Sequence, residues 1–145
     1  MGFHREHAIV TTAPAEAIWR RWTTVDFWPE DDPDCRWARV DGAFVVGAKG
    51  KVKTGGPAAR FTVTQLERNH AMCFEIRLPG ATMSFPHTAE SVEQGIRLTH
   101  GLTITGPLAP LWSRLVGRGV AAGLPEVVAL VATNALSQAG EHSEA

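Results

Sequence analysis

Two histidines, His87 and His100, are the residues whose type and spacing best suit chemistry in this chain. A neutral imidazole offers one hydrogen-bond donor and one acceptor, and it exchanges a proton near pH 7 more readily than other side chains. A two-residue turn at Gln94-Gly95 would pair Ala89 with His100 and His87 with Leu102, which makes the histidines diagonal neighbours on adjacent strands. Alternation at period two places both on an apolar face, His100 with Ile96, Leu98, Leu102 and Ile104, and His87 with Met83, Phe85 and Ala89.

This pair has two interpretations. In the first, both histidines contact a bound molecule, and His87 and His100 act as catalytic acid and base, assisted by Arg36 or Arg39. In the second, each is a core or rim histidine whose ring nitrogens are satisfied by protein partners. The residue types leave both interpretations open.

The same alternation predicts an apolar wall around the histidines. Gln65 is a lone polar member of it, and it needs a partner, which is a ligand oxygen, water or the backbone. Trp37 lies in a segment whose two faces cannot be distinguished, so it either lines the cavity or fills the core. The predicted ligand-binding residues are Trp37, Phe61, Val63, Gln65, Phe74, Ile76, Phe85, His87, Leu98, His100, Leu102, Leu111, Leu115 and Val128.

Other site chemistries are not expected. Six histidines are present, but no Cys/His spacing or His-Glu-X-X-His pattern accompanies them, so we expect no metal and no cofactor. A Gly-X-Ser-X-Gly elbow, a Walker loop and a dinucleotide glycine fingerprint are also missing from the sequence, which disfavours hydrolase and nucleotide-enzyme functions. The acidic residues 30–34 lack calcium-loop spacing and are predicted to form a solvated loop.

The elements that would position these residues follow from local patterns. A short helix is expected after the first strand, with Thr12 as its N-cap, Pro14 in its first turn and an apolar face of Ile18, Trp19 and Trp22. A second, brief helical turn is expected at residues 25–29. Strand-like composition between turn signals predicts seven strands, at residues 3–12, 35–44, 47–54, 60–68, 71–78, 82–92 and 96–105.

The longest helix is predicted at residues 106–136, after a proline-rich entry. Its apolar residues recur at spacings of three and four, so one broad face must be buried. Pro125 interrupts this face downstream of Gly117, Gly119 and Gly123, and we expect a kink there. The face comprises Leu111, Trp112, Leu115, Val116, Val120, Leu124, Val127, Val128 and Val131.

Composition bounds the class of protein. The 145 residues suit a single domain spanning residues 1–145, whose polar end at residues 140–145 is expected to fray. With 44% hydrophobic residues and a net charge of -1, the chain is not typical of a nucleic-acid binder or a polybasic membrane anchor. Its start lacks a signal-peptide core and no segment reaches about 18 apolar residues, so we expect a soluble protein without membrane insertion. Two cysteines, Cys35 and Cys73, favour a reducing compartment, the cytoplasm.

Hairpin-joined strands and one long apolar helix predict an α+β fold in which a curved, seven-stranded antiparallel sheet wraps around the helix and leaves a ligand pocket. Four motifs in this order, at residues 13–19 (APAEAIW), 25–29 (VDFWP), 41–44 (DGAF) and 105–108 (TGPL), resemble the SRPBCC superfamily. The resemblance is to its polyketide cyclase/dehydrase and lipid-transport branch, and it implies the START-like helix-grip fold with a hydrophobic cavity between sheet and C-terminal helix.

Two classes of function remain. The resemblance implies proteins that carry, sense or chemically alter small apolar molecules, and such a fold does not specify one reaction. We favour non-catalytic binding of a lipid- or polyketide-like molecule. The alternative is a cyclase, dehydratase or isomerase that uses the acid–base chemistry of His87 and His100. On either view the partner is a small hydrophobic molecule and not a nucleic acid, and the protein is a monomer or homodimer.

Overall fold

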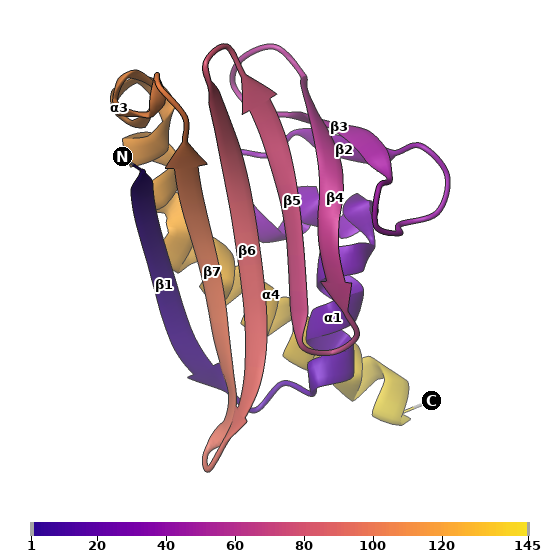
Figure 1. Ribbon diagram of the computed structural model, residues 1–145. Coiled ribbons are helices and arrows are strands. Elements are labelled where there is room, and N and C mark those ends of the chain that lie inside the picture. Colours follow the sequence, from indigo (N-terminus) through magenta and orange to yellow (C-terminus); the bar gives the residue numbers. More distant parts are fainter. Residues whose placement is uncertain (1, 145) are drawn as a thin grey trace.

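The computed structural model describes the backbone of residues 2–144 and the side chains of residues 2–140. Seven strands form one antiparallel sheet in the order β1-β7-β6-β5-β4-β3-β2. The described helices lie on one face of this sheet, which curves around them (Figure 1). The predicted α+β helix-grip architecture, with two short helices after the first strand and a long C-terminal helix, is therefore confirmed.

The strands are close to their predicted positions, except that the segment at residues 35–44 is a strand over four residues only. The chain turns sharply after that strand, because Gly42 and Gly47 adopt positive φ angles of 80° and 91°. The strands are β1 (Phe3–Thr11), β2 (Trp37–Val40), β3 (Lys49–Lys53), β4 (Ala59–Glu67), β5 (Ala71–Leu78), β6 (Ala81–Val92) and β7 (Gly95–Thr105).

The first helix begins without the predicted cap. Its N-cap residue is Pro14, which makes no side-chain hydrogen bond, and the expectation for Thr12 is wrong. The preceding turn is closed by Thr11 instead, whose Oγ1 accepts a 3.1 Å hydrogen bond from the amide of Ala13. The helices before the sheet hairpins are α1 (Ala15–Thr23), the 3₁₀ turn η1 (Val25–Phe27) and α2 (Trp28–Asp31).

The C-terminal helix is irregular near its start. It consists of α3 (Ala109–Trp112), the π-helical turn η2 (Ser113–Gly117) and α4 (Arg118–Glu144), and α4 continues through Pro125. Pro125 lies on the exposed side of α4, where helix carbonyls already tilt towards water, so α4 remains helical through it. The irregularity that the structure shows is the wide turn η2.

This turn changes which apolar residues are buried. A π turn contains more residues than an α turn, so positions before and within it lose their phase with the inward face of α4. Leu111 and Leu115 are 48% and 65% exposed, whereas Leu124, Val128 and Val131 are buried. The segment Ala109–Gly140 is long and apolar enough to cross a membrane by length and composition, contrary to our expectation. Its buried residues Val128, Val131, Ala132 and Ala135 nevertheless belong to the core beneath the sheet.

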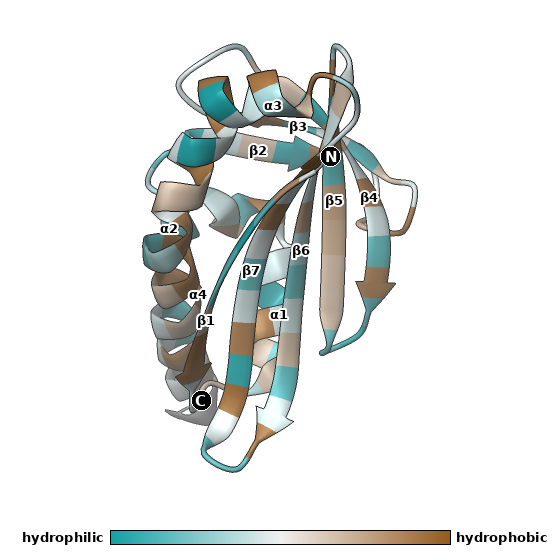
Figure 2. Ribbon diagram, turned by 60° about the vertical axis from the view of Figure 1, so that its left-hand side comes forward, coloured by the Kyte–Doolittle hydropathy of each residue, from teal (hydrophilic) through white to brown (hydrophobic). Residues whose placement is uncertain are grey.

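The core consists of three clusters rather than one. Helix α4 packs mainly on β1 and β7 and on α1 and α2, and apolar residues alternate with polar ones along β7 (Figure 2). One cluster joins α1, β7 and α4, the second lies beneath β3 and β4, and the third lies between β6, β7 and α3. The largest fully buried members of the first cluster are Ile18, Met72, Leu98 and Val128. Those of the second are Phe61 and Val63, and those of the third are Leu102 and Ile104.

A buried ion pair joins the helices to one another. Arg21 of α1 donates from Nε and Nη2 to the carboxylate of Asp31 at 3.0 and 2.6 Å, and both side chains are about nineteen-twentieths buried (4% and 6% exposed). Asn134 of α4 donates to the same carboxylate at 2.8 Å, and the Arg21 guanidinium lies 4.1 Å from the ring of Phe27. The acidic residues 30–34 are therefore not simply a solvated loop, because Asp31 is the buried counter-ion of Arg21.

Replacing Asp31 by Ala should destabilise the fold strongly, by about 3–5 kcal/mol, because it leaves the charge of Arg21 buried and uncompensated. Glu30 also accepts from Arg21, at 3.2 Å, but its side chain is 58% exposed. Glu30→Gln is therefore the matched control and should cost no more than about 1 kcal/mol. Urea unfolding of the two variants checks this, and similar midpoints for both would contradict it.

The predicted fraying at residues 140–145 lies largely outside the described residues. The backbone of α4 is described to Glu144, and the side chains of residues 141–145 are not. Deletion of residues 141–145 should lower the melting temperature by no more than a few degrees, because this polar end carries no apolar stripe. A larger decrease, measured by circular dichroism, would show that the segment packs on the domain.

Candidate functional site

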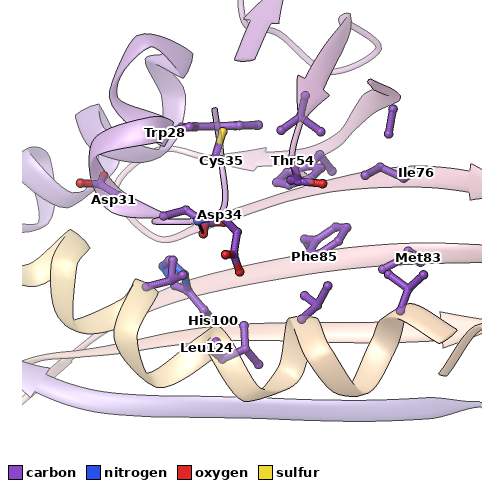
Figure 3. Close-up of a pocket in the computed structure, with 18 of the residues that line it drawn as sticks. Trp28, Asp31, Asp34, Cys35, Thr54, Ile76, Met83, Phe85, His100 and Leu124 are labelled. Carbon is purple, nitrogen blue, oxygen red and sulfur yellow. Dashed lines mark hydrogen bonds between the residues drawn. The ribbon is translucent and has the colours of Figure 1, made fainter. Parts of the chain in front are cut away.

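A cavity of about 830 Å³ lies between helix α4 and the sheet. Strands β5, β6 and β7 form one wall, helix α4 forms the other, and the segments α1–β2 and β3–β4 contribute the rim (Figure 3). Most lining side chains are apolar, and three acidic residues, Asp31, Asp32 and Asp34, also line the cavity. This position, next to central strands that α4 does not cover, is where a curved sheet and a helix leave space for a small molecule.

The structure brings together part of the predicted site. The predicted residues that line the cavity are Phe74, Ile76, Phe85, His87, His100 and Leu115. A second group, which is fully or almost fully buried, belongs to the core clusters and does not line it: Phe61, Val63, Leu98, Leu102 and Val128. Leu98 and Leu102 flank His100 on β7 and belong to two different clusters, so His100 lies at the gap between them.

Three predicted residues lie elsewhere, each for a local reason. A β-bulge between Val63 and Gln65 shifts the alternation of β4, so Gln65 becomes exposed and its amide donates to Glu67. Trp37 is 38% exposed, with the Arg39 guanidinium 5.1 Å from its ring. Leu111 precedes η2 and faces outward as described above.

The two histidines are closer than the predicted register allows. His87 and His100 are direct cross-strand partners, and Ala89 pairs with Leu98. The predicted diagonal arrangement is wrong because Val92 pairs with Gly95, so the two-residue turn is Glu93-Gln94. The imidazole centroids are 4.3 Å apart, at an interplanar angle of 60°.

Hydrogen bonds define the protonation of each ring. The indole Nε1 of Trp22 donates to Nε2 of His100 at 3.0 Å, so the proton of a neutral His100 is on Nδ1. His87 Nδ1 lies 2.7 Å from the carbonyl oxygen of Phe85, so His87 also carries its proton on Nδ1. This leaves the Nδ1–H of His100 and the Nε2 lone pair of His87 available to a molecule in the cavity, as an adjacent donor and acceptor.

Burial keeps both rings neutral. It lowers the pKa of His87 to about 4, although the carbonyl groups of Phe85 and Met72 favour the charged form. The pKa of His100 is also well below its ordinary value, because of burial and then of repulsion by His87. Two uncharged imidazoles at pH 7 therefore lie against the cavity.

Several lining residues were not predicted. Trp22 shares the apolar face of α1 with Ile18, which indicated burial but not its bond to His100. Trp28 and Cys35 come from the short segments around α2, where no periodic pattern exists. Burial raises the pKa of the Cys35 thiol to about 11, so it is not a thiolate nucleophile at pH 7.

The acidic residues that line the cavity were also not predicted as part of the site. Burial raises the pKa of Asp32, and the neighbouring carboxylates of Asp34, Glu126 and Asp31 act in the same direction. Within residues 2–140, no group of three or more His, Cys, Asp or Glu side chains is arranged to hold a metal ion.

Comparison with known proteins shows similarity in structure only. No family model matches the sequence, and neither does any curated protein. Among solved structures, the di-domain aromatase/cyclase StfQ of the steffimycin pathway superposes with a TM-score of 0.78 at 14% identity, over 97% of this chain and 52% of StfQ. The present chain thus spans about half of that protein.

Two further structures match along most of their own length. Norcoclaurine synthase of Thalictrum flavum has a TM-score of 0.72 at 12% identity, covering 95% of this chain and 96% of the enzyme. The protein Ara h 8.0201 has a TM-score of 0.70 at 15% identity, covering 94% and 99%. These likenesses establish the fold alone: the chain has the helix-grip fold.

The neutral histidines predict that stability decreases in mild acid. Unfolded histidines bind protons below about pH 6.5, whereas the folded His87 does so only near 4. Each histidine whose folded-state pKa is this low should therefore lower the free energy of unfolding by about 2 kcal/mol when the pH falls from 7 to 5. Urea unfolding at both pH values measures this difference.

A double variant isolates the effect. His87→Phe keeps a ring beside Phe74, and His100→Gln keeps an acceptor for Trp22, so the pair loses its titration with little loss of packing. The variant should lose most of the difference in unfolding free energy between pH 7 and pH 5. An unchanged difference in the double variant would contradict the prediction.

Proposed function

We propose that this protein binds a small hydrophobic molecule, lipid- or polyketide-like, in the cavity between the sheet and helix α4. The proposal rests on a cavity of about 830 Å³ whose lining is mostly apolar. The uncharged imidazoles of His100 and His87 line it side by side, as a hydrogen-bond donor and an acceptor. Apolar surface supplies affinity by leaving water, and a few polar groups fix orientation. Similarity to an aromatase/cyclase and to norcoclaurine synthase supports a role with small organic molecules.

The ligand in this proposal carries a hydroxyl or carbonyl group. His100 Nδ1–H would donate to a ligand oxygen, and His87 Nε2 would accept from a ligand hydroxyl. Both histidines, otherwise desolvated, would then be satisfied by the ligand. The free thiols of Cys35 and Cys73 suit a reducing compartment, and the cytoplasm is part of the proposal.

The second candidate is an enzyme, a cyclase or dehydratase, and the 4.3 Å separation of the imidazoles favours it. His87 Nε2 would take a proton from the substrate while His100 Nδ1–H stabilises the carbonyl oxygen on which negative charge develops. However, a general base works best when its pKa is near the working pH, and the pKa of about 4 makes His87 a weak base. Binding without turnover is therefore the function that we favour.

Two ligands of equal shape test the polar contact. His100→Leu should weaken the binding of 2-naphthol by about 1–3 kcal/mol, which is the cost of an unsatisfied hydrogen-bonding group. The binding of 2-methylnaphthalene should be nearly unaffected. Quenching of Trp22 and Trp28, which line the cavity, provides the readout. Because both ligands are compared in the same variant, any rearrangement around Trp22 affects them equally. Equal loss for both ligands, or loss for neither, would make His100 a packing residue.

Turnover separates the two candidates. If the protein only binds its ligand, no product should form on prolonged incubation with an aromatic polyketide precursor. If it is an enzyme, a product should form with the wild type and not with His87→Ala or His100→Ala. Native mass spectrometry of the protein purified from cells would show whether a molecule accompanies it.

A further inference from the structure

His87 and His100 lie next to each other at the cavity with opposite hydrogen-bonding roles. His100 presents its Nδ1–H because Trp22 occupies its Nε2, and His87 presents the lone pair of Nε2 because its Nδ1 is engaged by the carbonyl oxygen of Phe85. Within residues 2–140, no hydrogen bond joins the two rings to each other, although their centroids are only 4.3 Å apart. The donor and the acceptor therefore both need a partner from the cavity.

A single hydroxyl group can serve both rings. It donates its one proton and accepts through its lone pairs, with a hydrogen bond of about 2.8 Å on either side. Its oxygen can therefore join two nitrogen atoms that are up to roughly 5.6 Å apart, and the centroids of the two rings are closer than this. A carbonyl or ether oxygen only accepts, so it satisfies His100 and leaves Nε2 of His87 unpaired.

The indole N–H groups around the pair are already engaged. Trp22 and Phe74 pack against the ring of His87 at centroid distances of 5.5 and 5.9 Å, and the N–H of Trp22 is committed to His100. Trp28, which also lines the cavity, donates to the backbone carbonyl of Trp22 at 3.1 Å. A ligand that only accepts therefore leaves the acceptor of His87 desolvated and unpaired, which weakens binding.

We infer that the two histidines recognise one neutral hydroxyl group, so that the site takes hydrophobic alcohols, phenols or enols in preference to ketones and ethers of the same shape. The hydroxyl donates to Nε2 of His87 and accepts from Nδ1–H of His100. Trp22 is a positioning residue, because its hydrogen bond decides which nitrogen of His100 carries the proton. The inference rests on the proposed function and adds the polar group of the ligand to it.

The test compares 1-tetralol with 1-tetralone, which share a carbon skeleton and carry a hydroxyl and a carbonyl group at the same position. Wild-type protein should bind the alcohol about tenfold more tightly, measured by calorimetry. His87→Phe keeps a ring beside Phe74 and removes the acceptor, so the ratio of the two affinities should fall to near one. His70→Phe is the matched control, because His70 bonds to the backbone of Ala89 and is not among the lining residues, and it should leave the ratio unchanged.

Nitrogen-15 NMR of the wild type gives a readout that does not depend on the folding of a variant. The alcohol should shift the resonances of both His87 Nε2 and His100 Nδ1, whereas the ketone should shift mainly that of His100. Trp22→Phe should allow the proton of His100 to distribute between its two nitrogens and should lower the preference for the alcohol. If Trp22 only fills space, the proton stays on Nδ1 in this variant.

Other outcomes overturn the inference. Equal affinity of the wild type for 1-tetralol and 1-tetralone, or a preference for the alcohol that persists in His87→Phe, would mean that the pair does not select a hydroxyl. A response of only one histidine to the alcohol would mean that no single group bridges the two rings. Failure of 1-tetralol, 1-tetralone and 2-methylnaphthalene to bind at all, with no adduct in native mass spectrometry, would instead refute the proposed function.

Discussion

The arrangement of helix α4 depends on two fixed points, and the buried pair of Arg21 and Asp31 supplies one of them. Through Asn134, in the second half of the helix, this pair ties α4 to α1 and α2. The other fixed point is Gly117, where the helix approaches Ile104 and Phe3 too closely for a side chain. A buried ion pair of this kind is valuable for position rather than for net stability, because desolvation offsets much of its attraction. Because the helix is held at these two points, it passes across the central strands without packing on them. The cavity lies between the helix and these strands.

Much of this fold follows from the sequence, because hydrophobic alternation and turn residues are strong local signals. They placed the strands, the long helix and the inward orientation of His87 and His100. The errors at Gln65, at the β6–β7 turn and before α4 share one physical cause. A bulge, a shifted turn and a π turn each change the register of the chain by about one residue. The local sequence is compatible with more than one position for each of them, so contacts with a neighbouring strand or helix decide the position.

The site itself was harder to predict than the fold for a related reason. Phe74 and Phe85 could be placed on a face, but a face does not reveal whether a residue contacts the core or the cavity. That distinction depends on where the helix leaves the sheet, which is decided by long-range contacts such as that of Asn134 with Asp31. The Trp22–His100 hydrogen bond, between residues 78 positions apart, lies beyond any local pattern.

The core residues and the cavity residues overlap only in part, and this affects how such a chain can evolve. Trp22, Met72 and Met83 belong to core clusters and also line the cavity. Phe61, Leu98, Leu102 and Val128 are almost wholly buried and do not line it, whereas a second set, which includes Gly119 and Gly123, lines it and belongs to none of the three core clusters. Mutations in the second set therefore alter what fits inside without first weakening the packing that folding requires. A lineage can change its ligand by drift in a few wall positions while its backbone persists. Proteins that superpose with TM-scores of 0.70 to 0.78 at only 12% to 15% identity are the expected outcome of such a division.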